Sequence, residues 1–413
     1  MSEGAGVAPS ATEDASRGPL AHRTFRWLLA ARTTSVLGNA VAPIALAFAV
    51  LDLTGSAADL GLVVAARSIA NVAVLLFGGV LADRLPRDVV LVGASLAAAA
   101  TQVVVAALVV TGTATIPLLV VMGVLNGAVA AVSLPAAAAL VPETVPPALL
   151  RPANALLRLG LNGGSVVGAS AGAGIVALVG PGWGLAVDAA GFALAGLLFS
   201  RLRLPRSARP ARPTASVLAD LREGWQEFTR RSWVWVVVAQ FAVLNAAFVG
   251  ATTVLGPVVA DGSFGRAAWG LVVAAQTVGL VLGAVLALRW RPRRGLAVGV
   301  AAMAATAVPI VALGLAPALP VLVAAFLLGG VALEVFAIAW DQSLQGHVPR
   351  AALSRVYSYD MVGSFVAIPL GEVLIGPAAH LVGTRPTLLA CAAIVVVATA
   401  AALSAPSVRR LTS

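Results

Sequence analysis

The stretch that decides the fold reads Gly79-Val80-Leu81-Ala82-Asp83-Arg84-Leu85-Pro86-Arg87-Asp88-Val89-Val90-Leu91. It connects one long apolar segment to another with only a few charged residues. Charged side chains are costly inside hydrocarbon, so such a connection must turn at a membrane face. An ordinary basic loop accounts for the arginines. It does not account for a carboxylate placed directly after a Gly-x-Leu-Ala helix end.

The composition indicates an integral membrane protein. Of the 413 residues, 60% are hydrophobic and only 11% are charged, which leaves too little polar surface to cover a soluble domain. The single cysteine, Cys391, excludes a disulfide within the chain, and the three histidines are scattered, so we expect no metal site. No glycine-rich phosphate loop is present. We therefore expect no cofactor, no nucleic-acid partner and no enzymatic activity.

Twelve segments are long enough to cross a membrane, which takes about 20 residues for roughly 30 Å of hydrocarbon. They are 25–51, 58–82, 89–111, 116–140, 157–179, 183–202, 233–258, 267–289, 295–315, 319–342, 357–381 and 386–405. Arginines gather in the tails and in the loops after even-numbered spans, while the opposite loops carry only Arg266 and Arg385. The positive-inside rule therefore predicts a multi-pass protein of the cell inner or plasma membrane with both termini in the cytoplasm.

The sequence also repeats at half its length. The segment that begins at Gly78 returns 205 positions later at Gly283, and Val145-Pro146 returns 203 positions later as Val348-Pro349. Such repeats are common in secondary transporters. We therefore predict an all-α membrane fold of two pseudo-symmetric six-helix bundles. The expected divisions are a tail (1–23), a first bundle (24–202), a basic linker with an amphipathic helix (203–232), a second bundle (233–405) and a tail (406–413).

These features resemble the major facilitator superfamily. The opening stretch matches that family's loop between helices 2 and 3 at Gly79, Leu81, Asp83, Arg84, Arg87 and Leu91, and departs from it at Pro86 and Asp88. The resemblance implies an inner gate formed by Gly79, Asp83, Arg84, Arg87 and Asp341. Within this gate we expect Asp83 to cap the amino end of span 11, because helix N-termini attract negative charge.

Further phrases, among them Trp340-Asp341-Gln342 and Ala153–Leu157, are similar to the branch that contains macrolide-efflux and enterobactin-export proteins. That resemblance covers roughly residues 24–405 and implies export driven by proton exchange. Span 5 carries Gly164-x₃-Gly168-Ala169-x₂-Gly172, similar to an exporter-associated motif. Small-residue packing between helices explains the same glycines equally well.

Charges within the predicted spans are the candidates for function. At 1.5 Å per residue, Arg67 on span 2 and Glu372 on span 11 lie about 10–15 Å below the outer surface. The resemblance places these spans face to face, so the two side chains are expected to pair as an outer gate. The alternative is a structural Arg67, satisfied by Asn71.

Glu334 on span 10 lies deeper and is the predicted proton-coupling residue, with Glu372 second. Pairing with Arg158 would instead keep Glu334 ionised.

The remaining polar residues on central spans predict a mostly apolar substrate cavity, which suits a small amphipathic compound. Its expected lining is Asn39, Asn126, Gln240, Asn245 and Glu334. Each amide has an alternative role as a contact between helices.

We accordingly predict a secondary transporter, a monomer in contact with lipid, that exports a drug-, macrolide- or siderophore-like compound in exchange for protons. An importer or uniporter without proton coupling, or a membrane receptor that transports nothing, remains open at this stage.

Overall fold

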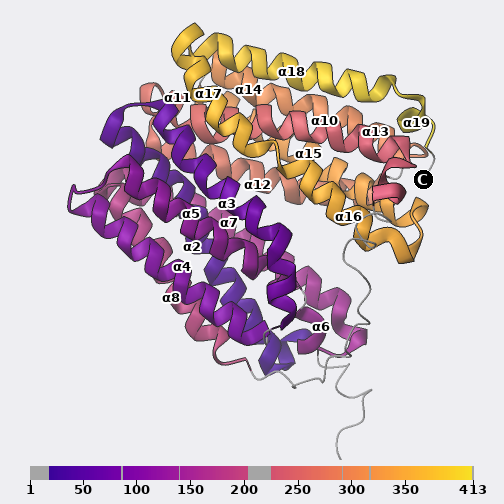
Figure 1. Ribbon diagram of the computed structural model, residues 1–413, viewed down its shortest axis with the longest axis horizontal. Helices are drawn as coiled ribbons and strands as arrows, with labels where there is room; N and C mark the ends of the chain where they lie inside the picture. The colour runs from indigo at the N-terminus through magenta and orange to yellow at the C-terminus, as the bar shows by residue number, and fades with distance from the viewer. Residues whose placement is uncertain are drawn as a thin grey trace, which may run out of the picture.

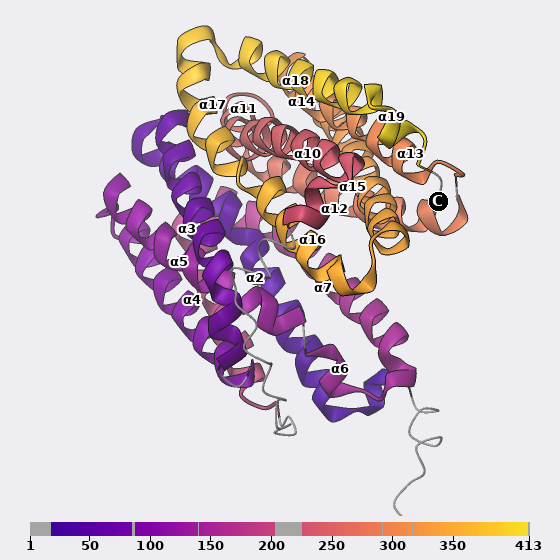
Figure 2. The ribbon, with the colours of Figure 1, turned by 45° about the vertical axis from the view of Figure 1, so that its right-hand side comes forward.

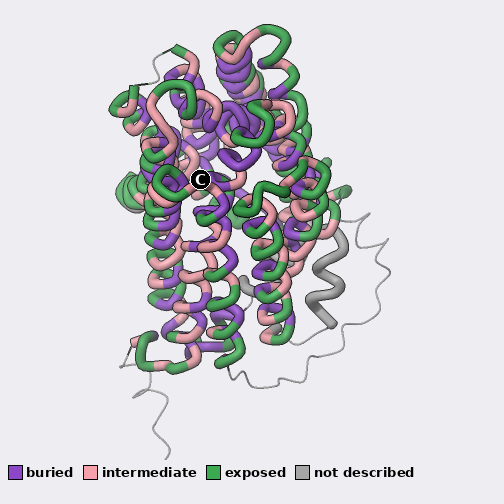
Figure 3. Tube along the Cα trace, turned by 90° about the vertical axis from the view of Figure 1, so that its left-hand side faces the viewer, coloured by how far each residue is buried: buried purple, intermediate pink, exposed green. Residues whose placement is uncertain are grey.

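The structure is a computed structural model that describes residues 18–84, 87–138, 140–202, 225–290, 292–315 and 318–411. Within these ranges, twelve helical spans are long and apolar enough to cross a membrane, which confirms the predicted fold class. In Figure 3 the long helices alternate between buried and exposed positions. This is the pattern of helices that turn one face to a bundle and the other outward.

The first bundle runs from indigo to magenta in Figure 1. Its spans are α2 (Arg23–Thr54), α3 (Ala57–Arg84), α4 (Arg87–Val110), α5 (Ile116–Ala138), α7 (Leu150–Val179) and α8 (Pro181–Phe199). Short turns lie at η1 (Pro19–Ala21), α6 (Val141–Thr144) and η2 (Pro147–Leu149). Helix α2 packs against α7 and α8, while α5 packs against α3 and α4.

The second bundle contains several interrupted spans. Its elements are α10 (Ser232–Gly250), the π-helical η3 (Ala251–Leu255), α11 (Gly256–Gly262), α12 (Arg266–Arg289), α13 (Gly295–Ala302), η4 (Met303–Thr306), α14 (Ala307–Leu315), α15 (Leu319–His347), α16 (Arg350–Phe365), α17 (Ile368–Val382), α18 (Thr384–Ser404) and α19 (Pro406–Arg409). Pro257, Pro309 and Pro369 lie at or just after three of the interruptions. Proline removes a backbone donor and disturbs the regular helix there.

The two ends of the molecule differ in their connections. We call the end with the start of α2 and the end of α18 the tail end, and the opposite end the far end. At the far end, five turns contain a glycine with positive φ, a conformation that other residues rarely adopt. These glycines are Gly55, Gly112, Gly180, Gly265 and Gly383. They allow the far-end turns to be short.

The two bundles meet most closely at the far end. Helix α3 packs against α17 and α7 against α12. A Cβ on Gly61 would clash with the carbonyl oxygen of Glu372, and one on Gly376 would meet Ala58. The backbones of the two halves therefore touch. In Figure 2 the bundles lie side by side at α3 and α17 and diverge toward the tail end.

Only the last part of the expected amphipathic helix lies within the described residues. Residues 225–229 are helical, and Trp225 and Phe228 contact the ring of Tyr359 on α16, with ring centroids 5.5 and 5.8 Å apart. Phe228 is 7% exposed. This part of the apolar face thus packs on the second bundle.

Candidate functional site

Arg67 is the centre of a polar network inside the first bundle. Its Nε donates to Oδ1 of Asn126 on α5 (3.1 Å), and its Nη2 donates to Oδ1 of Asn39 on α2 (3.2 Å). Asn126 in turn donates to Thr101 on α4 (3.3 Å). The guanidinium therefore joins α3 to α2 and α5, and Asn126 extends the network to α4. Asn71 bonds the carbonyl of Gly127 (3.4 Å) and is not a partner of Arg67.

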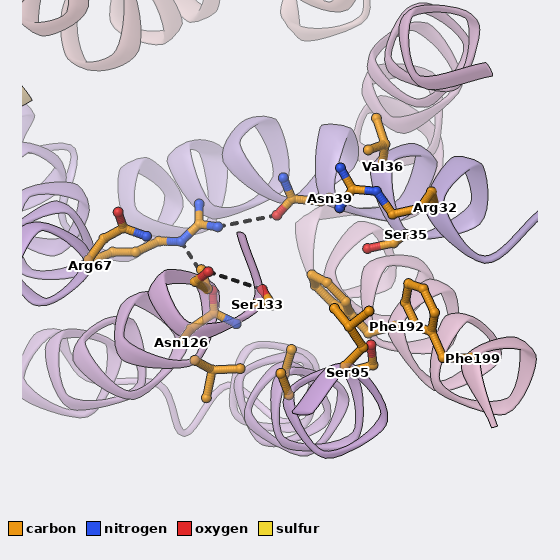
Figure 4. Close-up of a pocket in the computed structure, with 16 residues that line it drawn as sticks. Arg32, Ser35, Val36, Asn39, Arg67, Ser95, Asn126, Ser133, Phe192 and Phe199 are labelled. Carbon is orange, nitrogen blue, oxygen red and sulfur yellow. Dashed lines mark hydrogen bonds between the residues drawn. The ribbon is translucent and has the colours of Figure 1, made fainter. Parts of the chain in front are cut away.

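This network borders a cavity of about 280 Å³ within the first bundle. Figure 4 shows Arg67 and Asn126 at one side and Phe192 and Phe199 at the other, with Arg32 beside Asn39. Two of the residues predicted to line a central substrate cavity, Asn39 and Asn126, border this cavity inside the first bundle. The cavity lies among α2, α3, α4, α5 and α8.

The second-half amides do not line this cavity. Gln240 is 4% exposed and donates to Thr399 on α18 (3.2 Å), while Asn245 is 7% exposed and donates to the carbonyl of Ser364 on α16 (2.9 Å). Both connect helices of the second bundle. Their position favours the role of helix contacts over that of ligand contacts.

Glu372 is 2% exposed, and Arg67 does not form an ion pair with it in this structure. Both residues are described, yet no nitrogen–oxygen contact within 4.0 Å joins them, because the guanidinium is turned toward Asn39 and Asn126. Ser68 lies next to the Glu372 carboxyl group, and one carboxyl oxygen of Glu372, Oε2, has no hydrogen-bond partner. Arg67 still acts on Glu372 over a longer distance.

Asp188 on α8 is a second buried carboxylate. It is fully buried, and Gln102 on α4 donates to its Oδ2 (2.5 Å). Its Oδ1 has no partner and lies against Gly38 on α2. Sequence reasoning missed the Gln102 contact, since nothing in the spacing of two residues on separate helices indicates it.

Glu334 on α15 faces Arg158 on α7 across the two halves. Arg158 Nη1 lies 4.0 Å from Glu334 Oε1, at the limit of an ion pair. The Arg158 side chain is 78% exposed, whereas that of Glu334 is 18% exposed. The space between the bundles is therefore open around Arg158. The β-carbon of Glu334 also packs against Gly283 of α12.

The predicted inner gate is only partly described. The side chains of Gly79, Asp83, Arg84 and Arg87 lie outside the described residues. Asp341, at the tail end of α15, accepts a hydrogen bond from Tyr357 on α16 (2.9 Å). This contact stays within the second bundle.

The span 5 glycines pack against α2. A Cβ on Gly168 would clash with the carbonyl of Leu37, and one on Gly172 would lie 2.7 Å from Val41. Ala173 instead faces Gly270 of α12 in the other half. The small residues on α7 therefore serve close packing on both sides of the helix.

At the far end, Arg266 joins the two halves. It binds both carboxylate oxygens of Asp52 on α2 (2.6 and 3.0 Å) and those of Asp261 in its own half (2.6 and 3.2 Å). Its guanidinium also lies 4.9 Å from the ring centre of Phe48. This cross-half ion pair was not predicted, although all three charged residues stand out in the sequence.

Comparison with known proteins shows which family has this architecture. The sequence profile of the Major Facilitator Superfamily matches residues 28–371. The chain belongs to the major facilitator superfamily. This membership identifies a secondary transporter and not an enzyme, and it confirms the family predicted from the 79–91 stretch.

Within the superfamily, the chain is 26% identical over 409 residues to the multidrug efflux pump Tap of Mycolicibacterium fortuitum, which covers 96% of this chain and 97% of Tap. Two solved structures share the fold at 16% identity. The nucleoside transporter NupG has a TM-score of 0.74 and covers 92% of this chain and 98% of its own. A bacterial homologue of the human lysosomal transporter Spinster, inward-facing and unoccupied, has a TM-score of 0.68 and covers 97% and 98%.

Proposed function

We propose that this transporter exports a small amphipathic compound in exchange for protons, by alternating access between its two bundles. The Arg158–Glu334 contact across the halves carries the proposal. A proton on Glu334 removes the negative charge that attracts Arg158, so protonation weakens a contact between the bundles. Proton binding is thereby linked to their relative position. The similarity to the efflux pump Tap supports export.

The conformation fits one stage of such a cycle. The far end is closed by Arg266 and Asp52 and by the Gly61 and Gly376 contacts, while the bundles diverge toward the tail end. With both termini in the cytoplasm of an inner or plasma membrane, as the arginines predict, this is the inward-facing state. A monomer suffices, because both bundles come from one chain.

Uniport without proton coupling is the second candidate, and the same contact favours it in one respect. If Arg158 remains close to Glu334 throughout the cycle, the carboxylate stays ionised and carries no proton. The packing of Gly164, Gly168 and Gly172 against α2 gives antiport no added support. The two candidates therefore differ in what Glu334 does.

Transport in liposomes separates them. Purified protein is supplied with neutral, cationic and anionic amphipathic dyes and with a radiolabelled macrolide, with and without an imposed proton gradient. We expect gradient-driven uptake by the wild type and only gradient-independent exchange by Glu334→Gln, since glutamine cannot release a proton. Arg151→Gln, an exposed change near the tail end of the same helix as Arg158, is the control. Gradient dependence retained by Glu334→Gln would exclude this residue as the coupling site.

A further inference from the structure

We propose that the cavity in the first bundle binds the negatively charged group of a small organic monoanion, such as an aromatic carboxylate, between Arg32 and Arg67. The proposal depends on the proposed transport function only where it names such monoanions as a class of transported substrate. Binding itself requires neither transport nor a proton gradient.

The cavity carries positive charge that no nearby carboxylate in the described part of the chain pairs with. Arg32 and Arg67 both line the cavity, and no carboxylate of the described residues lies within 4.0 Å of either guanidinium. The Nε of Arg32 is buried without a hydrogen-bond partner. Asp188 and Glu372 act on Arg67 from outside the cavity wall. A charge left unpaired inside a span is costly, and a bound anion would relieve that cost.

The donors are arranged for an anion. Figure 4 shows Arg67 and Arg32 on opposite sides of Asn39. Because Oδ1 of Asn39 accepts from Arg67, its amide nitrogen remains as a further donor. Ser35 adds a hydroxyl group to the wall, whereas the hydroxyl of Ser133 donates to the carbonyl of Ala130 (3.0 Å). Arginine forks match the geometry of a carboxylate, and such charge-assisted bonds are the strong ones.

The rest of the wall selects an apolar body. Phe192 and Phe199 lie together on α8, away from Arg67, and Leu91 and Val36 add to the apolar lining. The volume of about 280 Å³ falls just below the range of about 300–1,000 Å³ that is typical of drug-sized ligands. The cavity therefore fits a single-ring compound with one charged end.

Protection of an introduced cysteine measures this binding directly. The only native cysteine is removed by Cys391→Ala, and Ser133→Cys places a thiol in the cavity wall. The rate of thiol modification is measured in detergent at increasing benzoate concentration, with benzyl alcohol as the neutral analogue. We expect benzoate to slow the modification at millimolar concentrations, and benzyl alcohol to leave it unchanged. Equal protection by both compounds would overturn the proposal.

Arginine variants test whether protection by benzoate depends on the charge in the cavity. Arg32→Gln should raise the benzoate concentration for half-protection by at least about tenfold, because it removes a charge-assisted partner. Arg32→Lys, which keeps the positive charge, should retain part of the protection by benzoate. Arg32 makes no hydrogen bond to the described residues, so this variant should fold even if Arg67→Gln does not. Arg26→Gln, on the exposed surface of the same helix, is the matched control.

An unchanged half-protection concentration in Arg32→Gln would refute the anion site. Failure of the proposed function leaves a different signature, because loss of proton-driven transport with intact benzoate protection contradicts coupling and not binding.

Discussion

Asp52→Asn should open the far end more often. Arg266 contacts two carboxylates, but Asp261 lies in its own half and only Asp52 lies in the other. The substitution therefore removes the charge that crosses the interface and leaves the orientation of Arg266 intact. The side chains are 26% exposed for Arg266 and 42% for Asp52, so water and salt screen much of their attraction.

The magnitude follows from this exposure. Exposed ion pairs contribute about 0.2–1 kcal/mol, and the two-pronged geometry places this pair near the upper limit. A loss of about 1 kcal/mol changes the ratio of closed to open molecules about fivefold. The effect should decrease as salt is added, because the charges lie near the surface.

A buried cysteine at the interface reports the opening. Val254 is fully buried and lies next to Gly61 of the other half, so Val254→Cys in a Cys391→Ala background should react with a thiol reagent only when the far end opens. Asp52→Asn should raise that rate about fivefold. Asp261→Asn removes a carboxylate that contacts the same arginine within one half. Its labelling rate should stay within about twofold of that of the parent. Equal rates for the two variants would refute a cross-half role for Asp52.

Three further predictions concern single contacts. Gln102→Leu leaves both oxygens of Asp188 without a partner and should lower stability by about 1–3 kcal/mol, measured by thermal unfolding in detergent; the double variant with Asp188→Leu should recover part of this loss, and strict additivity would contradict the contact. Gly168→Val should lower the melting temperature through its clash with Leu37, while Gly174→Val, with open space at its Cβ, should not. Asp83→Asn should increase labelling of cysteines at the tail end and reduce transport, and unchanged labelling with full transport would exclude a role of Asp83 in the inner gate.

The sequence was sufficient for the twelve spans, because segment length and hydropathy alone determine which helices cross a membrane. Depth along a helix follows from the rise per residue alone. That count placed Arg158 closer to the inner face than Glu334 and left their pairing open, whereas in the structure the two side chains lie 4.0 Å apart.

The direction in which a side chain points could not be obtained in this way. Arg67 and Glu372 have the same depth, yet Arg67 turns into its own bundle toward Asn39 and Asn126. Gln240 likewise turns toward Thr399. The rotation of a helix depends on packing against neighbours distant in sequence. For the same reason the Asp52–Arg266 pair, 214 residues apart, was missed.

The glycine contacts of the far end have a thermodynamic consequence. Where Gly61 and Gly376 bring backbone against backbone, the two halves touch without large side chains, so separating them exposes little apolar surface there. Exposure of apolar surface is what raises the heat capacity when protein surfaces separate. Opening at these contacts should therefore add little to the heat-capacity difference between the two states. Any drift of the balance with temperature should therefore come from the buried side chains around these contacts, such as Val254, and not from the glycines themselves.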